Sequence, residues 1–298
     1  MNPRYVMNSR YGIIVNPKSG KLPLVMKIAR IQEAASILGD CVYAGIDTTK
    51  SDFVQCAQEL ADKVDVLIIA GGDGTVSDII NGVDLGDRVL SYLPFGTGCF
   101  MRSAIGMPFN IRKAAEQIRD GCEHGVDVFE VNDELGFCAS VGIEGFFLEY
   151  RLNGDHRFAK GLFSYLIGGM KSLPEYIGNY NIYSTTVVAD GQLHCYRETV
   201  SCIVSTHSYF GGRCKISPNA NIDDGKLHVH TIQGRFPKLI GAYATGMVYK
   251  NMFGDHIECE EALVNSPGEQ YFQIDGEIRP KGKSFSFRVL SGRFAFRY

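Results

Sequence analysis

Apolar residues in the first part of the chain occur either in short continuous runs or at helical spacing. The continuous runs predict four buried strands, at 11–15, 41–46, 66–70 and 89–93. The spaced positions predict one helix over 51–63 and another over 23–38, the latter with Val25, Ile28, Ile31, Ala35 and Leu38 on its buried face. Alternating strands and helices indicate an α/β domain whose parallel sheet is covered on both sides.

The pattern changes near residue 126 to strands separated by turns. Alternation over 181–188 and the Asp190-Gly191 and Asp275-Gly276 pairs are typical of antiparallel hairpins. We therefore predict two domains, 1–125 and 126–298, the second mainly antiparallel, with a last strand that can pack back on the first domain. The apolar stretch from Phe158 to Ile177 predicts a helix, interpreted either as a core helix or as a lipid-binding wall.

Composition narrows the class of protein. The 298 residues carry a net charge of -3 without a basic run, which argues against a nucleic-acid partner. Nine cysteines, odd in number and without a Cys-x-x-Cys pair, indicate neither a zinc site nor a disulfide framework, and favour a reducing cytoplasmic compartment. No run approaches the length of a membrane span, so any membrane contact is expected to be peripheral.

The most informative stretch is the glycine-rich turn from Gly71 to Thr75, which follows a continuous apolar strand. A helix is expected to begin at Thr75, with Thr75 and Asp78 as a variant capping box and its first amides directed towards an anion. A carboxylate beside a phosphate requires a cation, so Asp73 implies Mg²⁺ carried by a nucleotide. The competing interpretation is a Gly-Asp-Gly turn kept for its geometry alone.

Other polar or glycine-rich segments also fall at predicted strand ends. They are Asn16, Thr48, the Gly72–Thr75 turn and the 94–98 segment Pro-Phe-Gly-Thr-Gly. Ligands of such sheets bind at the carboxyl ends of the strands, so we expect these segments to converge on one crevice.

The second half offers two groups of oxygen ligands. Asp275 and Glu277 flank the glycine of a hairpin turn, where they either accept a proton from a hydroxyl nucleophile or simply close the hairpin. Asn221, Asp223 and Asp224 form either a Mg²⁺ or Ca²⁺ loop or an ordinary acidic turn. His228 and His230, two residues apart without partners in ligand spacing, are interpreted as structural.

Together these segments resemble the diacylglycerol kinase catalytic family, which includes soluble bacterial lipid kinases and the sphingosine and ceramide kinases. The resemblance rests on six segments in the expected order: 13–20, 71–82, 93–98, 209–212, 218–227 and 275–277. It implies a nucleotide-binding α/β domain, a C-terminal β-sandwich-like domain and an active site in the cleft. It also implies ATP with Mg²⁺, and a hydroxylated lipid as the phosphoryl acceptor.

The same resemblance implies roles for individual residues. Nucleotide-binding residues would be Asn16, Thr48, Gly71, Gly72, Asp73, Gly74, Thr75, Gly96 and Thr97. Glu277 with Asp275 would be the base, with Asp73 as a further catalytic carboxylate that joins Asp127 in a metal and water network. Asn221, Asp224 and the Lys226 carbonyl would bind a structural Mg²⁺.

The chain departs from the family after Gly98 and again at Ala139, where an asparagine is typical. Where the family reads Gly-Thr-Gly-Asn-Asp, this chain has Cys99 and Phe100 in place of the last two residues, and neither ligates Mg²⁺ as a carboxylate does. A lipid kinase is the first expectation, with an NAD kinase-like enzyme or a weakly active or non-catalytic nucleotide or lipid sensor as alternatives. The lipid acceptor, the nucleotide preference and the formation of a homodimer stay open.

Overall fold

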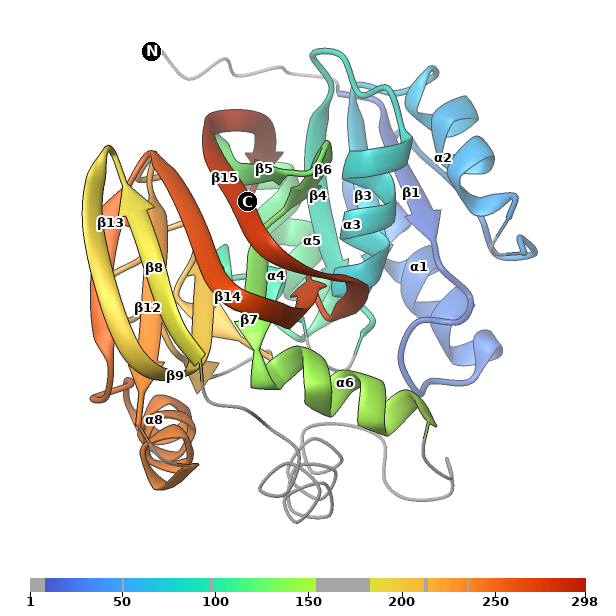
Figure 1. Ribbon diagram of the computed structural model, residues 1–298. Coiled ribbons are helices and arrows are strands. Elements are labelled where there is room, and N and C mark those ends of the chain that lie inside the picture. Colours follow the sequence, from blue (N-terminus) through green and yellow to red (C-terminus); the bar gives the residue numbers. More distant parts are fainter. Residues whose placement is uncertain (1–8, 50, 97–98, 154–182, 212–213, 235) are drawn as a thin grey trace. The chain divides into compact units, whose positions relative to one another are not determined.

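The computed structural model describes residues 9–49, 51–96, 99–153, 183–211, 214–234 and 236–298 (Figure 1). The predicted helix from Phe158 to Ile177 and the site residue Thr97 therefore lie outside the described residues. The chain forms two compact units, one made of Met1–Val126 with Ser291–Tyr298 and the other of Asp127–Leu290.

The first unit has a parallel sheet with helices on both faces. Its strands, in the spatial order β2-β1-β3-β4, are β2 (Cys41–Ala44), β1 (Tyr11–Val15), β3 (Val66–Gly71) and β4 (Val89–Pro94). Its helices are α1 (Leu24–Leu38), α2 (Phe53–Ala61), α3 (Asp73–Gly82), α4 (Phe100–Ala104) and α5 (Ile111–Asp120). Helix α1 packs against α5 and α2 packs against α3, on opposite faces of the sheet, as right-handed crossovers require. The predicted α/β class is thus confirmed.

The far end of the chain belongs to this first unit. In β15 (Glu277–Arg297), Phe296 pairs in parallel with Leu90 of β4, and the Ser91 hydroxyl donates to the Arg297 carbonyl at 2.7 Å. The Arg297 guanidinium lies 2.5 Å from the Glu123 carboxylate. Residues 291–298 therefore complete the β4 edge of the sheet.

The predicted buried face of α1 is wrong by a small rotation. Val25 is 78% exposed, whereas Lys27, Ile31, Ala34 and Leu38 are buried. Lys27 can occupy a core position because its long alkyl chain packs inside and its ammonium donates to the Pro17 carbonyl at 2.5 Å.

The start of α3 also differs from the prediction. Gly72 is the N-cap in an extended conformation, and the helix begins at Asp73, two residues before the expected Thr75. Thr75 occupies the third helical position, from which its hydroxyl accepts the Gly72 amide at 3.4 Å. The helix begins early because glycine needs no side-chain cap to leave the strand and enter the helix.

The second unit is mainly antiparallel, as predicted. Its strands are β5 (Glu123–Val131, which starts in the first unit), β6 (Glu134–Gly136), β7 (Cys138–Gly142), β8 (Tyr183–Ala189), β9 (Gln192–Ser205), β10 (Tyr209–Phe210), β11 (Cys214–Lys215), β12 (Leu227–Gln233), β13 (Asp255–Cys259), β14 (Glu261–Ile274) and most of β15. The long strands β9 and β14 each pair with β8 along one half and with β7 along the other. These four strands close on themselves around a core that contains Phe129, Phe272 and Phe287.

Both predicted hairpins are present in this unit. Asp190-Gly191 joins β8 to β9 and Asp275-Gly276 joins β14 to β15, and all four residues have positive φ. Positive φ at both central residues is the signature of a type I′ turn, which Asp-Gly pairs adopt readily.

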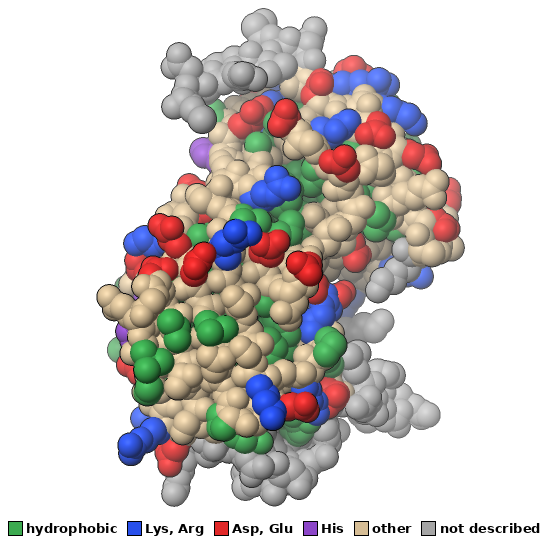
Figure 2. Space-filling view, turned by 45° about the horizontal axis from the view of Figure 1, so that its top comes forward, with side chains coloured by type: hydrophobic (Ala, Val, Ile, Leu, Met, Phe, Trp, Pro, Cys, Tyr) green, Lys and Arg blue, Asp and Glu red, His purple; other side chains and the backbone are tan. Residues whose placement is uncertain are grey.

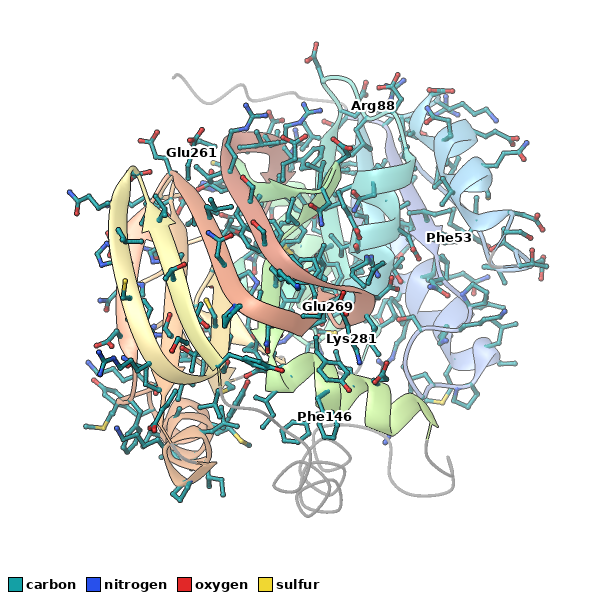
Figure 3. All side chains as sticks on the ribbon, in the orientation of Figure 1. Phe53, Arg88, Phe146, Glu261, Glu269 and Lys281 are labelled. Atoms are coloured by element: carbon teal, nitrogen blue, oxygen red, sulfur yellow. The ribbon has the colours of Figure 1, made fainter. Side chains whose placement is uncertain are left out.

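Among the described residues, two helices pack on the strands of the second unit. Helix α6 (Ile143–Asn153) packs on β14, where the ring of Phe146 meets Tyr271 edge-on at 5.4 Å and the Lys281 ammonium lies 3.7 Å from the Tyr271 ring centre (Figure 3). Helix α8 (Phe236–Val248) packs on β9, β11 and β12. Across the described ranges, no helix has both the length and the apolar character that a membrane crossing requires. Acidic and basic side chains are interspersed on the face in Figure 2, in keeping with the small net charge.

Candidate functional site

Three loops converge at the carboxyl edge of the parallel sheet in the first unit. The Asn16 side-chain amide donates to the Thr75 hydroxyl at 3.0 Å, which joins the loop after β1 to the start of α3. The amides of Phe95 and Gly96 donate to the Gly71 carbonyl at 3.0 and 2.9 Å, which joins the loop after β4 to the same turn. The structure thus brings together Asn16, Gly71–Thr75 and Gly96 as predicted from their strand ends.

The glycines in these loops are needed for close backbone approach. A Cβ atom on Gly96 would lie 2.5 Å from the Gly72 Cα, and one on Gly20 would lie 1.9 Å from the Phe95 carbonyl oxygen. Both distances are far inside van der Waals contact. Any side chain at Gly96 or Gly20 therefore separates the loops that form this edge.

The remaining nucleotide candidates lie at the ends of the same elements. Thr48 follows β2 and closes a turn in which its hydroxyl donates to the Gly45 carbonyl at 2.6 Å. The amides of Asp73 and Gly74 begin α3, where first-turn N–H groups lack intrahelical acceptors and the helix dipole is positive. This end of α3 offers a place for an anion.

Asp73 is partly enclosed and directed at the first turn of α4. Its Oδ1 accepts the Met101 amide at 3.4 Å. Burial raises the pKa of the Asp73 carboxyl to about 6, and the amides of Phe100, Met101 and Cys99 offset part of that shift. Asp73 therefore tethers the first turn of α4 to α3, and its role with a metal ion stays a prediction.

The two residues that replace the family's Asn-Asp pair are both buried. Cys99 adopts a left-handed conformation with φ 53°, and its sulfur accepts the Tyr92 hydroxyl at 3.2 Å. Burial raises the pKa of the Cys99 thiol to about 11, so it is neutral at physiological pH. A neutral thiol and the Phe100 ring are poor partners for Mg²⁺, which prefers oxygen ligands.

Sequence inspection missed Lys27 as a contributor to this edge. Its side chain is almost fully buried beneath the loop after β1, and burial lowers the pKa of its ammonium. The contact with the Pro17 carbonyl fixes the loop that carries Asn16 and Ser19. The one signal in the sequence is that Lys27 stands where the helical spacing calls for an apolar residue.

In the second unit, Asp275 is bound to the backbone of a neighbouring strand. Its carboxylate accepts the Cys138 amide at 2.9 Å and the Phe137 amide at 3.2 Å, and its own amide donates to the Cys138 carbonyl at 2.8 Å. These bonds point the carboxylate at β7. Asp275 is thus placed to hold the hairpin in position.

Glu277, two residues further on, is more accessible. Its side chain is 44% exposed and lies 3.2 Å from the Arg279 guanidinium, which also pairs with Glu134. Of the two predicted base candidates, Glu277 is the one whose carboxylate retains free acceptor capacity.

The predicted metal loop is organised around Asp224. Its Oδ2 accepts the Asn221 amide at 2.9 Å and its Oδ1 accepts the Lys226 amide at 3.1 Å. Buried Asp127 contacts the same loop, because its Oδ2 accepts the Gly225 amide at 2.5 Å. Carboxylate, amide and backbone oxygens are the ligand types that Mg²⁺ prefers, but both Asp224 oxygens are bonded to backbone amides here, so the Mg²⁺ site stays a prediction. The pairing of Asp127 with Asp73 stays a prediction.

His228 has partners that its sequence neighbourhood does not reveal. Its Nε2 lies 2.9 Å from Asp224 Oδ2 and its Nδ1 lies 3.0 Å from His256 Nε2. His230 instead contacts the Phe253 carbonyl at 2.8 Å inside the unit, in keeping with a structural role.

Two family models match the chain. Residues 10–131 match the diacylglycerol kinase catalytic domain, and residues 140–278 match the YegS C-terminal NAD kinase beta sandwich-like domain. Together these matches span most of the chain.

Individual relatives agree with the family models. A diacylglycerol kinase of Bacillus subtilis is 25% identical over 276 residues, which cover 90% of this chain and 89% of that one. A diacylglycerol kinase of Staphylococcus saprophyticus is 28% identical over 287 residues, with 92% and 91% covered. The solved structure of a Bacillus anthracis diacylglycerol kinase superposes with a TM-score of 0.75 at 22% identity, with 98% of each chain covered, and supports the fold.

Proposed function

Because the chain belongs to the diacylglycerol kinase catalytic family, we propose that it transfers the γ-phosphoryl group of ATP to a hydroxyl group of diacylglycerol or a related lipid. The observation that carries this proposal is the convergence of Asn16, Gly72 and Gly96 at one edge of the parallel sheet, beside the N-terminus of α3. Helix starts at the carboxyl edge of such sheets are the usual place for phosphate groups.

In the proposed reaction, the first unit binds the nucleotide. The amides of Asp73 and Gly74 would donate to phosphate oxygens, and Gly72 and Gly96 would leave room for the phosphate chain. Mg²⁺ bound with ATP would supply positive charge that offsets the phosphate charge, and Asp73 would be the carboxylate that holds it. Cys99 and Phe100 offer no second carboxylate for the metal ion.

Glu277 is the proposed general base. Its partly exposed carboxylate would accept the proton of the lipid hydroxyl as that oxygen attacks the γ-phosphorus and ADP departs. Asp275 would position the hairpin that carries Glu277, through its bonds to the amides of Phe137 and Cys138.

The test is a phosphoryl-acceptor panel. The purified chain is incubated with γ-labelled ATP, Mg²⁺ and mixed micelles of diacylglycerol, ceramide or sphingosine, with Asp73→Asn as the inactive control. We expect label in one lipid for the parent protein and none for the variant. No transfer to any lipid by the parent would refute the lipid-kinase proposal.

The same panel, together with calorimetry, decides between two alternatives. An NAD kinase-like activity is suggested by the match of the second domain, and would place the label on NAD added to the panel. A nucleotide or lipid sensor is favoured by the buried Cys99 and Phe100, and would bind ATP in calorimetry without any transfer.

We further propose that the protein works at the surface of an anionic membrane. Helix α8 and the loop after it expose an apolar surface, made up of Ile240, Met247, Val248, Tyr249, Met252 and Phe253. Val248 is 89% exposed and Met252 is 73% exposed, and residues 236–253 include Lys238 and Lys250 but no aspartate or glutamate. Apolar side chains beside lysines suit a bilayer that contains anionic headgroups.

Vesicle sedimentation tests this contact. The parent protein is expected to sediment with phosphatidylglycerol vesicles and less with phosphatidylcholine vesicles. Val248→Glu with Met252→Glu should abolish sedimentation, whereas Leu193→Glu, at an exposed apolar residue of β9, should not. Equal sedimentation of all three proteins would show that the α8 surface is not the membrane contact.

A further inference from the structure

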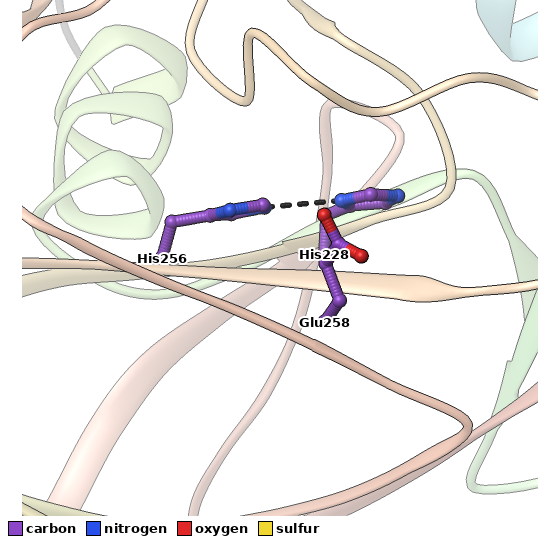
Figure 4. Close-up of side chains that lie close together, drawn as sticks. All are labelled: His228, His256 and Glu258. Carbon is purple, nitrogen blue, oxygen red and sulfur yellow. Dashed lines mark hydrogen bonds between the residues drawn. The ribbon is translucent and has the colours of Figure 1, made fainter.

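Two histidines and a glutamate meet on adjacent strands of the second unit. Antiparallel pairing of β12 and β13 puts Glu258 opposite His228, and His256 is two residues before Glu258 on the same face of β13. The nitrogen and carboxylate atoms of the three side chains lie within 4.8 Å of one another (Figure 4).

Asp224 prepares His228 to act as a ligand. Both Asp224 oxygens already accept backbone amides, so the carboxylate is oriented, and its Oδ2 also faces His228 Nε2 at 2.9 Å. A carboxylate can only accept a hydrogen bond, so His228 must donate to it from Nε2. The neutral imidazole then carries its proton on Nε2 and keeps a lone pair on Nδ1. This carboxylate–histidine arrangement is the one that commonly supports a metal-bound imidazole.

We propose that His228 Nδ1, His256 Nε2 and the Glu258 carboxylate bind a divalent transition-metal ion such as Zn²⁺. Two imidazoles and one carboxylate, with a water in the fourth position, are a common ligand set for Zn²⁺, whereas Mg²⁺ prefers oxygen ligands. The three ligands of this site differ from those of the predicted oxygen loop, although Asp224 of that loop contacts His228, and the site does not depend on the proposed kinase activity.

The geometry needs only a small adjustment. Zn–N bonds of about 2.0–2.1 Å in a tetrahedral site separate two nitrogens by about 3.3 Å. The two imidazole nitrogens are 3.0 Å apart in a hydrogen bond, with ring planes 7° from parallel. Metal binding therefore requires the nitrogens to separate slightly, the rings to turn until both lone pairs face the ion, and the proton of this bond to move from His256 Nε2 to Nδ1. His256 is half-buried and Glu258 is exposed, so both can move and an ion can reach them.

The Glu258 carboxylate of the proposed site is already paired with a lysine. The Lys226 ammonium lies 2.8 Å from Glu258 Oε2, and both side chains are well exposed. An exposed ion pair of this kind contributes little, so a metal ion can displace the lysine at small cost.

A metal ion here would link three parts of the unit. It would clip the edge strand β13 to β12, and through His228 and Asp224 it would brace the loop whose Gly225 amide contacts Asp127. Its expected role is therefore structural.

Calorimetric titration of the full chain with Zn²⁺ tests the proposal, after chelator treatment and in excess Mg²⁺ to occupy oxygen sites. The parent protein should bind one equivalent. His256→Gln should weaken that binding by more than about 100-fold and Asp224→Asn by about 10–100-fold. Two controls should keep it: His124→Gln, at an exposed histidine elsewhere, and Cys195→Ser, at an exposed thiol.

Substitution with Co²⁺ gives a second readout that a merely structural histidine pair would not produce. The parent protein should show the visible absorption of tetrahedral Co²⁺, and His256→Gln should lack it while melting as a folded protein. Absence of binding in the parent, unchanged binding in His256→Gln, or loss of binding in Cys195→Ser would each overturn the proposal.

Discussion

Asp275 and Glu277 stand two residues apart in one hairpin, yet their environments predict opposite consequences of neutralising them. The Asp275 carboxylate is bound to the amides of Phe137 and Cys138, whereas the Glu277 carboxylate is partly exposed. We expect Asp275→Asn to act mainly on stability and Glu277→Gln mainly on turnover.

The loss of stability in Asp275→Asn follows from its hydrogen bonds. Asparagine tolerates the left-handed conformation at this position, where φ is 49°, so the turn itself survives. Its amide keeps one oxygen, which can still accept the Cys138 and Phe137 amides, but replaces the second acceptor of the Phe137 amide with an NH₂ group. Exchange of a charged acceptor for a neutral one, with an N–H group facing a backbone N–H, costs about 1–3 kcal/mol.

Glu277→Gln removes little stabilising interaction. Arg279 keeps its pairing with Glu134, and an exposed ion pair contributes about 0–1 kcal/mol. If Glu277 accepts the hydroxyl proton, its loss should lower kcat by about 10²–10⁴-fold with little change in KM for ATP.

Scanning calorimetry and steady-state kinetics on the same preparations separate these effects. Asp275→Asn should lower the free energy of unfolding by about 1–3 kcal/mol while retaining most of the kcat measured below its melting transition. The reasoning is refuted if Asp275→Asn loses as much kcat as Glu277→Gln at an unchanged melting temperature. Full kcat in Glu277→Gln would equally refute it.

Three further predictions concern the first unit. Gly96→Ala should raise KM for ATP by about 10-fold or more, because its Cβ would lie 2.5 Å from the Gly72 Cα; ATP titrations measure this. Burial raises the pKa of Asp73 to about 6, so the folded state binds its proton more tightly than the unfolded state. Stability should therefore fall by at most about 3 kcal/mol as the pH rises from 4 through 6, and melting curves of Asp73→Asn should lack this fall. Cys99→Asn with Phe100→Asp should restore oxygen ligands and increase the Mg²⁺-dependent rate; an unchanged rate would contradict a metal role for these positions.

Much of the fold was predictable because it follows local patterns. The strand of Val66–Gly71 is buried on both faces, so its sequence is continuously apolar, and the Asp-Gly pairs could hardly be anything but hairpin turns. The convergence of Asn16, Gly72 and Gly96 followed from the rule that parallel strands present their carboxyl ends at one edge.

What the sequence did not reveal depends on partners that are distant along the chain. The burial of Lys27 requires the Pro17 carbonyl above it, and the inward direction of Asp275 requires amides about 138 residues away. His228 appeared isolated because His256 and Glu258 reach it only through the register of two paired strands. Hydrophobic periodicity carries no information about such polar contacts.

The course of β15 has a consequence for biosynthesis. The edge of the first sheet beside Leu90 stays open until Phe296 has been translated, because that residue arrives some two hundred positions later. The amino-terminal half therefore cannot finish folding on the ribosome ahead of the remainder. A nascent chain arrested before residue 291 should show protease-sensitive β4.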